Sequence, residues 1–409
     1  MRQHSKLLGG ILLVSGTTIG AAMLALPVST GMAGFWPSVL LFVFYWIYMS
    51  FTAFLMLEVN LWAKDNDNLM SMVKMTLGKP GQAVSWMLYL FLLYSLTTAY
   101  IAGSAPIVID VVNATFGVVM PEWAGAIPLL IIFGYFVYRG TQSVDRVNRL
   151  LMLGLVVAFA SMVFYVAPHV KSELLFHVDW KYILMGLSVV ATSFGFHIII
   201  PSLVTYLDRD IAKLKKVIFI GGAIPLLVYI LWEFLTLGII PIEGPNGIEE
   251  AFISGGNGAQ HLLTAFLGNP IIATVARFFS FFAIVTSFLG VSLSLSDFLA
   301  DGLSIQKTRG GRGLLYCLTF LPPLCITLLD PRAFLSALEY AGAFGVVSLL
   351  GLFPALMVWS GRYVKGLSDR SPFRTWGGKG MLLLVILVSL AVIGNEIAIK
   401  LDLYHIGKL

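Results

Sequence analysis

The chain has 409 residues, of which 58% are hydrophobic and only 11% are charged, with a formal net charge of +5. Soluble domains are about half apolar and a quarter charged, so this composition excludes a soluble enzyme or binding module and indicates an all-α polytopic membrane protein. The positive excess needs no nucleic-acid partner, because cytoplasmic loops of membrane proteins collect lysine and arginine. Two cysteines inside one apolar segment exclude a disulfide framework.

Apolar runs recur along the whole chain, and we interpret residues 1–409 as a single integral membrane domain. A spanning helix needs about 20 mostly apolar residues. The sequence predicts eleven such helices, at about residues 7–28, 34–61, 83–116, 123–138, 150–167, 182–206, 217–240, 271–299, 313–329, 334–360 and 380–399. Twenty of the 26 lysines and arginines fall on the side of the N-terminus. This bias predicts a cytoplasmic N-terminus and an external C-terminus.

The first span, with the stretch LLVSGTTIGAAMLALP, carries weak helix formers in its middle. In hydrocarbon, non-helical backbone persists only where protein or a water-filled cavity surrounds it, so residues 15–20 predict a break at mid-depth. The half-helix after the break would present free N–H groups that suit a carboxylate. We assign this role to the backbone around Thr18, Ile19, Gly20 and Ala21, and we expect Gly16 and Thr17 to take part in substrate binding as well.

The third span is expected to pass beside this break. In its stretch YLFLLYSLTTAYIAGSAP, we expect Tyr100 to donate its hydroxyl to the same carboxylate and Thr97 to line the pocket. A carboxylate ligand would therefore meet side-chain donors as well as backbone donors.

The sixth span repeats the pattern of the first in the stretch ATSFGFHIIIPSL. A second break here would leave free carbonyls, which suit an ammonium group, and we assign that role to Ser193, Phe194 and Gly195. The rings of Phe194, Phe196 and His197 could face an aromatic ligand. Packing against lipid or neighbouring helices is the alternative for each ring.

Two interrupted helices five spans apart are typical of a transporter built from inverted repeats. The repeats would cover about residues 7–167 and 182–360, with an extra helix at about 380–399. Small residues also let membrane helices pack closely, which is the alternative explanation for both clusters.

Ionisable residues inside spans are candidates for function. His197 and Glu233 are candidate proton carriers, and an ion pair between Glu233 and Arg277 is the competing explanation. Carboxylates nearer helix ends fit snorkelling or pairing at a helix terminus; they are Glu58, Asp297 and Glu396. The long external loop at 242–269 is expected either to form a short surface helix over an entrance or to be a solvated loop.

Three stretches resemble a known family. GTTIGAAMLALP, TSFGFHIIIPSL and TSFLGVSLSLSDFLADGL resemble the first-, sixth- and eighth-helix signatures of the bacterial aromatic amino acid permeases, within the hydroxy and aromatic amino acid permease family of the amino acid-polyamine-organocation superfamily. The resemblance implies a fold like that of the bacterial leucine transporter and proton-driven uptake of tyrosine or tryptophan. The sixth-helix motif departs from the family after its histidine, where this chain has three isoleucines.

The same resemblance implies a possible sodium site. In the wider superfamily, Na⁺ can lie between the first and eighth helices, and Thr286 and Ser287 fall at the matching place. Oxygen ligands suit a hard cation. Back-bonding of both hydroxyls to their own helix is the alternative.

We therefore expect a symporter that imports an aromatic amino acid by alternating access, coupled to H⁺ or Na⁺, with no other cofactor and no obligate protein partner. A Na⁺-coupled or broader neutral and hydroxy amino acid transporter is the nearest alternative. An integral membrane enzyme would need convergent catalytic groups, and a channel would need a continuous polar path.

Overall fold

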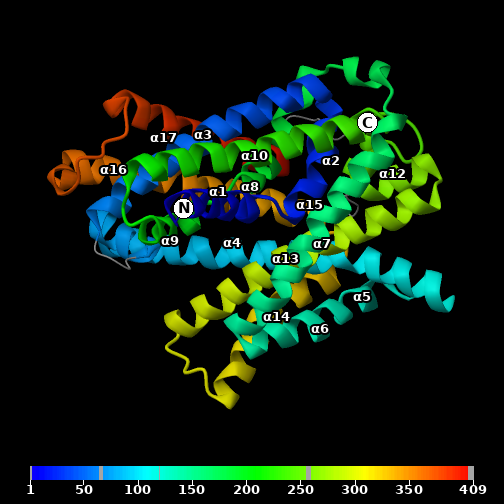
Figure 1. The fold of residues 1–409 in the computed structure, drawn as a ribbon, viewed down its shortest axis with the longest axis horizontal. Coiled ribbons are helices and arrows are strands. Elements are labelled where there is room, and N and C mark those ends of the chain that lie inside the picture. The colour runs from blue at the N-terminus through cyan, green and yellow to red at the C-terminus, as the bar shows by residue number, and fades with distance from the viewer. Residues whose placement is uncertain (1, 64–67, 119, 255–258, 404–409) are drawn as a thin grey trace.

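The computed structural model describes residues 2–63, 68–118, 120–254 and 259–403, and the regular structure in these ranges is helical throughout. The longer helices are α1 (Arg2–Thr18), α3 (Phe35–Trp62), α4 (Leu69–Phe116), α6 (Ile127–Arg139), α7 (Thr141–Val166), α10 (Ile211–Leu237), α13 (Pro270–Gly302), α14 (Arg309–Leu329), α16 (Phe353–Tyr363) and α17 (Gly378–Lys400). Shorter elements include η1 (Ala21–Ala25), α2 (Leu26–Thr30), η2 (Gly31–Ala33), α5 (Glu122–Gly125), η5 (Trp180–Gly186), α8 (Leu187–Ser193), η6 (His197–Ile199), α9 (Ile200–Tyr206), α11 (Ile248–Ser254), α12 (Ala259–Leu267), α15 (Phe334–Tyr340) and the π-helical η7 (Ala341–Leu352). Figure 1 shows α1 and α8 in the middle of the bundle.

The helices confirm a polytopic membrane protein. Within the described residues, nine helices are long and apolar enough to cross a membrane, and the bent pair at the N-terminus makes ten. The remaining predicted span, 123–138, is the shorter apolar stretch Trp123–Arg139, formed by α5 and α6. Helix length alone therefore gives ten spans rather than the expected eleven.

Two helices begin well before the predicted spans. α4 starts at Leu69 instead of residue 83, with a kink at Gly78, whose φ of 78° is a conformation that glycine adopts at little cost. α7 starts at Thr141 instead of residue 150, and its exposed first turns hold an ion pair between Arg149 and Asp145. Polar residues marked both stretches as loops in the sequence, but they belong to helices that continue beyond the apolar core.

The predicted break in the first span is present. α1 ends at Thr18, η1 begins at Ala21, and the two halves are bent by 48°. The hydroxyls of Thr17 and Thr18 donate to the carbonyls one turn earlier, each at 2.7 Å. Such back-bonding competes with the regular helix ladder and favours a bend. Gly20 then takes an extended backbone conformation, which separates the half-helices.

The sixth predicted span is also broken. α8 ends at Ser193, and regular helix resumes only at η6 and α9, so Phe194, Gly195 and Phe196 lie in non-helical backbone. The break falls where the sequence places its glycine and histidine. Both interruptions in the middle of the bundle were therefore predicted at the right place.

The broken helices are enclosed by long ones. α10 packs against α1 and α3, and α13 packs against α4, α7 and η1. Residues Ala21–Ala33 are buried throughout, so the half of the first span after its break is surrounded by protein. This surrounding protein is what irregular backbone needs inside a membrane.

The long loop at 242–269 forms two short helices, α11 and α12, with residues 255–258 outside the described ranges. α11 packs against α2 and buries Ile248 and Ala251, and α12 packs against η1 and α13. The helical alternative for this loop is therefore correct, and its helices cover the second half of the broken first span.

Candidate functional site

A cavity of about 310 Å³ lies at the two breaks. Its size is within the range of small-molecule sites, about 300–1,000 Å³. The predicted residues that line it are Gly16, Thr17, Thr18, Ile19, Gly20, Tyr100, Gly195, Thr286 and Ser287. Apolar side chains from four other elements complete the wall and include Leu92, Leu96, Met152, Ile199, Val346 and Leu350. The cavity therefore combines exposed backbone at one break with an apolar chamber.

The cavity continues toward one end of the bundle. A second cavity of about 460 Å³ shares Tyr89, Ile198 and Ser294 with the first. Its other lining residues include Asn68 and Asp301, at the end of the molecule where α4 begins and α13 ends. The opposite side of the site is closed by the buried segment Ala21–Ala33.

The first backbone donor after the α1 break has a side-chain partner. The Ala21 N–H donates to Ser287 Oγ on α13 at 2.8 Å. The approach depends on Gly20, because a Cβ at that position would stand 2.6 Å from the same oxygen. The sequence placed Ser287 in a possible cation site, whereas its observed contact is the acceptor of a backbone N–H group.

Tyr229 joins the two breaks. Its hydroxyl lies 2.7 Å from the carbonyl oxygen of Thr18, at the end of α1, and 2.8 Å from that of Ser193, at the end of α8. The side chain is fully buried on α10. A phenol carries one proton, so it can donate fully to only one of these carbonyls at a time. Sequence reasoning did not find Tyr229, because nothing local indicates a contact with two distant helix ends.

Several expected residues lie outside the cavity lining. The Thr97 hydroxyl donates to the Leu93 carbonyl at 2.7 Å and is fully buried within α4. Phe194 packs against Tyr229, with ring centroids 5.2 Å apart, so packing is the observed role of this ring. The other expected residues outside the lining are Ala21, Ser193, Phe196 and His197.

His197 is buried and bonded to a neighbouring helix. Its Nε2 lies 2.8 Å from the Thr52 hydroxyl on α3. Its Nδ1 has no hydrogen-bond partner within the part of the chain that the structure describes. The histidine therefore ties the second break to α3 and does not face the cavity.

Glu233 has a different partner from the one considered in the sequence. Its Oε1 lies 2.6 Å from the Thr30 hydroxyl on α2, and the side chain is fully buried. No ion pair joins it to Arg277 among the described residues, so the alternative of a structural Glu233–Arg277 pair is wrong. The carboxyl group instead links α10 to the second half of the first span.

The two possible sodium ligands, Thr286 and Ser287, make different hydrogen bonds. Thr286 donates its hydroxyl to the Phe282 carbonyl at 2.7 Å, which is the back-bonded alternative. The lone pairs of the Thr286 hydroxyl oxygen can still coordinate a cation. One lone pair of the Ser287 hydroxyl oxygen can do the same. The described residues contain no group of three or more His, Cys, Asp or Glu side chains that could hold a metal ion.

The carboxylates nearer helix ends are paired, as expected. Arg362 donates to both carboxylate oxygens of Glu58, at 2.7 and 2.5 Å, and both side chains are about 1% exposed. Asp297 pairs with Lys307 at 2.7 Å. Glu396 accepts a hydrogen bond from the Ser188 hydroxyl at 2.6 Å. The Glu58 and Glu396 contacts join helices, and the Asp297 pair joins α13 to the segment before α14; none of these carboxylates lines the central cavity.

Comparison with known proteins decides the family. The chain matches the tryptophan/tyrosine permease family over residues 3–396. It belongs to that family. The tyrosine-specific transport system 1 of Haemophilus influenzae is 34% identical over 404 residues, covering 97% of this chain and 98% of the relative. The tryptophan-specific transport protein of Pseudomonas aeruginosa is 33% identical over 404 residues, covering 95% and 94%. The low affinity tryptophan permease of Escherichia coli K12 is 30% identical over 403 residues, covering 96% and 95%.

Membership of this permease family makes the chain an amino acid transport protein of the membrane and not an enzyme. The bacterial relatives imply the inner membrane as its location. The cavity at the two helix breaks is accordingly the candidate substrate site.

Proposed function

We propose that this permease imports tyrosine or tryptophan as a symporter, by alternating access. The observation that carries the proposal is the cavity at the two breaks, with the backbone of the α1 break on one side and an apolar chamber on the other. Relatives named for tyrosine or tryptophan transport support the substrate class. Helix termini of opposite polarity suit a zwitterion, and the chamber suits a large side chain.

In the bound state, the substrate carboxylate accepts hydrogen bonds from the backbone after the α1 break and from Tyr100. The Ser287 hydroxyl accepts from the Ala21 N–H in the structure, so this contact holds the backbone of the break in place and the carboxylate meets the neighbouring N–H groups. The ammonium group donates to the carbonyl at the end of α1. Tyr229 can donate fully to only one of the Thr18 and Ser193 carbonyls, so when it donates to Ser193 the Thr18 carbonyl, which lines the cavity, stays available as an acceptor.

The architecture that we propose is eleven spans with two five-helix inverted repeats, at about residues 7–167 and 182–360, followed by one further helix. The two matched breaks support the repeat, and the short α5–α6 stretch supplies the eleventh span. The lysine and arginine bias supports a cytoplasmic N-terminus. In that orientation the joined cavities open to the cytoplasm, and the structure corresponds to an inward-facing state.

We propose coupling to protons through Glu233. The Thr30 hydroxyl lies 2.6 Å from Glu233 and 2.8 Å from the Leu26 carbonyl, yet it has one proton for the two acceptors. A protonated Glu233 resolves this, because it donates to Thr30 while Thr30 donates to Leu26. The other oxygen, Oε2, has no hydrogen-bond partner among the described residues, and isolated buried carboxylates are strongly disfavoured. Proton binding would thus favour closure of α2 against α10.

Replacing Glu233 by Gln tests this coupling, because Gln mimics the protonated form. We expect Glu233→Gln to lose accumulation driven by a pH gradient but to keep exchange of labelled for unlabelled substrate. Glu396→Gln is the matched control, since Glu396 is also a buried carboxylate bonded to a hydroxyl. Full proton-driven accumulation by Glu233→Gln would refute the assignment. A requirement for Na⁺ would instead move the coupling site to Thr286 and Ser287.

Competition tests the substrate class. Unlabelled tryptophan and phenylalanine should suppress counterflow of labelled tyrosine, whereas serine and leucine should not. Equal competition by serine or leucine would favour the broader neutral amino acid transporter.

A further inference from the structure

A third pocket lies where α6 turns into α7 beside α13 and the start of α14. It shares no lining residue with the central cavity and shares Asp297 with the cavity of about 460 Å³. Its volume is about 360 Å³. Among the described residues, its lining holds three cationic side chains and one carboxylate, which leaves a net charge of two positive; they are Arg139, Lys307, Arg312 and Asp297. Its polar residues are not explained by amino acid transport.

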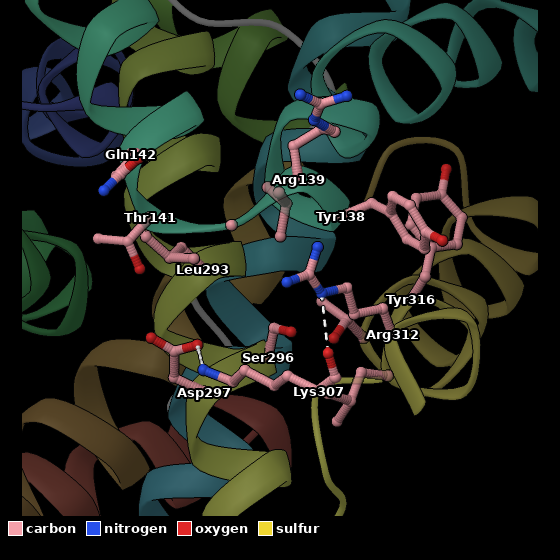
Figure 2. A pocket seen from close by; sticks show the side chains of 14 residues that line it. Tyr138, Arg139, Thr141, Gln142, Leu293, Ser296, Asp297, Lys307, Arg312 and Tyr316 are labelled. Atoms are coloured by element: carbon pink, nitrogen blue, oxygen red, sulfur yellow. Dashed lines mark hydrogen bonds and ion pairs between the residues drawn. The ribbon is translucent and has the colours of Figure 1, made fainter. Parts of the chain in front are cut away.

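One cation of this pocket, Arg312, is only partly paired among the described residues. Figure 2 shows the Arg312 guanidinium between Ser296 and Arg139, with the Lys307–Asp297 pair to one side. Its Nε donates to the Lys307 carbonyl at 3.1 Å, which fixes the orientation of the guanidinium. The two Nη groups have no partner in the described ranges and point into the open space. A planar guanidinium held in this way suits a phosphate oxygen pair.

Three further donors belong to residues that line the pocket. α7 starts directly after Gly140, and the N–H groups of Thr141 and Gln142, at its first turn, have no acceptor within the helix. The Thr319 hydroxyl on α14 is fully buried and has no partner in the described part of the chain. A buried hydroxyl without a partner is uncommon and indicates that a ligand or water completes it.

We propose that this pocket binds a phosphate group, presented by the headgroup of an anionic phospholipid. The deep wall is apolar, with Val137, Leu293 and Leu315, and the neighbouring Leu314 and Tyr135 are each 52% exposed. Apolar surface beside a basic pocket suits a lipid, whose acyl chains follow the helices while its phosphate meets the cations. The ligand would bridge the α6–α7 turn to the start of α14.

Native mass spectrometry of the full-length protein in mixed micelles tests the proposal, with phosphatidylglycerol as the anionic probe and phosphatidylcholine as the comparison. We expect retention of phosphatidylglycerol over phosphatidylcholine and a loss of about tenfold in its binding in Arg312→Gln, the equivalent of one charge-assisted hydrogen bond. Arg309→Gln is the matched control, because Arg309 is exposed in the same helical turn but does not line the pocket.

The substitution Thr319→Val distinguishes a specific binding site from non-specific attraction of anionic lipid to a basic surface. The substitution keeps the shape of the side chain and breaks no hydrogen bond in the structure, so the protein should fold and transport normally. We expect it to weaken phosphatidylglycerol binding several-fold. Binding of inorganic phosphate with the same dependence on Arg312 and Thr319, without a preference for one lipid, would support the phosphate site. The ligand would then be free phosphate and not a lipid headgroup. Equal losses in Arg309→Gln and Arg312→Gln, or binding unchanged in Thr319→Val, would overturn the proposal.

Discussion

The close approach of Gly20 to Ser287 makes a sharp prediction about the substrate site. The backbone of Gly20 is extended, with φ of −158°, so alanine can adopt it without strain. Its Cβ, however, would lie 2.6 Å from Ser287 Oγ. Contacting atoms stay about 3.5 Å apart, so the serine must move by roughly 0.5–1 Å. The Ala21 N–H then loses its acceptor.

An unsatisfied buried N–H group costs about 1–3 kcal/mol, and 1.4 kcal/mol corresponds to a factor of ten. We therefore expect Gly20→Ala to lower tyrosine uptake at limiting substrate by about 5- to 150-fold with normal membrane expression, and bulkier residues to abolish uptake. Gly394→Ala is the control for expression, because its Cβ would meet open space.

The double variant Gly20→Ala with Ser287→Ala tests the reason for the loss. Without the hydroxyl, the nearest atom of residue 287 lies 3.8 Å from the new Cβ, which is an ordinary contact. The double variant should therefore transport no worse than Ser287→Ala alone. Additive losses, or wild-type uptake by Gly20→Ala, would refute the reasoning.

Three further predictions concern the helix contacts. Tyr229→Phe removes the hydroxyl that joins the two breaks, so it should reduce uptake about tenfold with little change in expression; unchanged uptake would count against the link. Glu58→Ala leaves Arg362 buried without its partner, so thermal unfolding should show a loss of about 3–5 kcal/mol, and a loss below 1 kcal/mol would contradict that burial. Gly34 and Gly140 both have φ near 95°, but only at Gly34 would a Cβ meet a backbone carbonyl. Gly140→Ala should cost about 1–3 kcal/mol and Gly34→Ala clearly more; equal costs would contradict the difference in packing.

The two helix breaks could be predicted because their cause is local. The hydroxyls of Thr17 and Thr18 bond to their own helix, and Gly20 follows within two residues. Nothing beyond this short stretch is needed to see that the helix is weak there. The same reasoning located the break at Gly195, and short helices in the long loop at 242–269 were one of the two alternatives that the sequence left open.

The contacts between distant elements could not be predicted. Tyr229 meets Thr18 across 211 residues, and Glu233 meets Thr30 across 203. Neither Tyr229 nor Thr30 stands out in the sequence, because a tyrosine or a threonine inside a span more often packs against a neighbour or bonds to its own helix. Thr97 lies on a helix that contributes to the cavity, but its hydroxyl bonds to the carbonyl of Leu93 in the same helix and it does not line the cavity. Side-chain direction depends on helix rotation, which tertiary packing sets.

Uptake of labelled tyrosine and tryptophan into proteoliposomes tests the central claim most directly, with a pH gradient and a Na⁺ gradient imposed separately. We predict saturable accumulation of at least one of the two amino acids, driven by the pH gradient alone and lost in Gly20→Ala. Absence of saturable uptake of both amino acids under either gradient, by protein shown to be folded, would contradict the account.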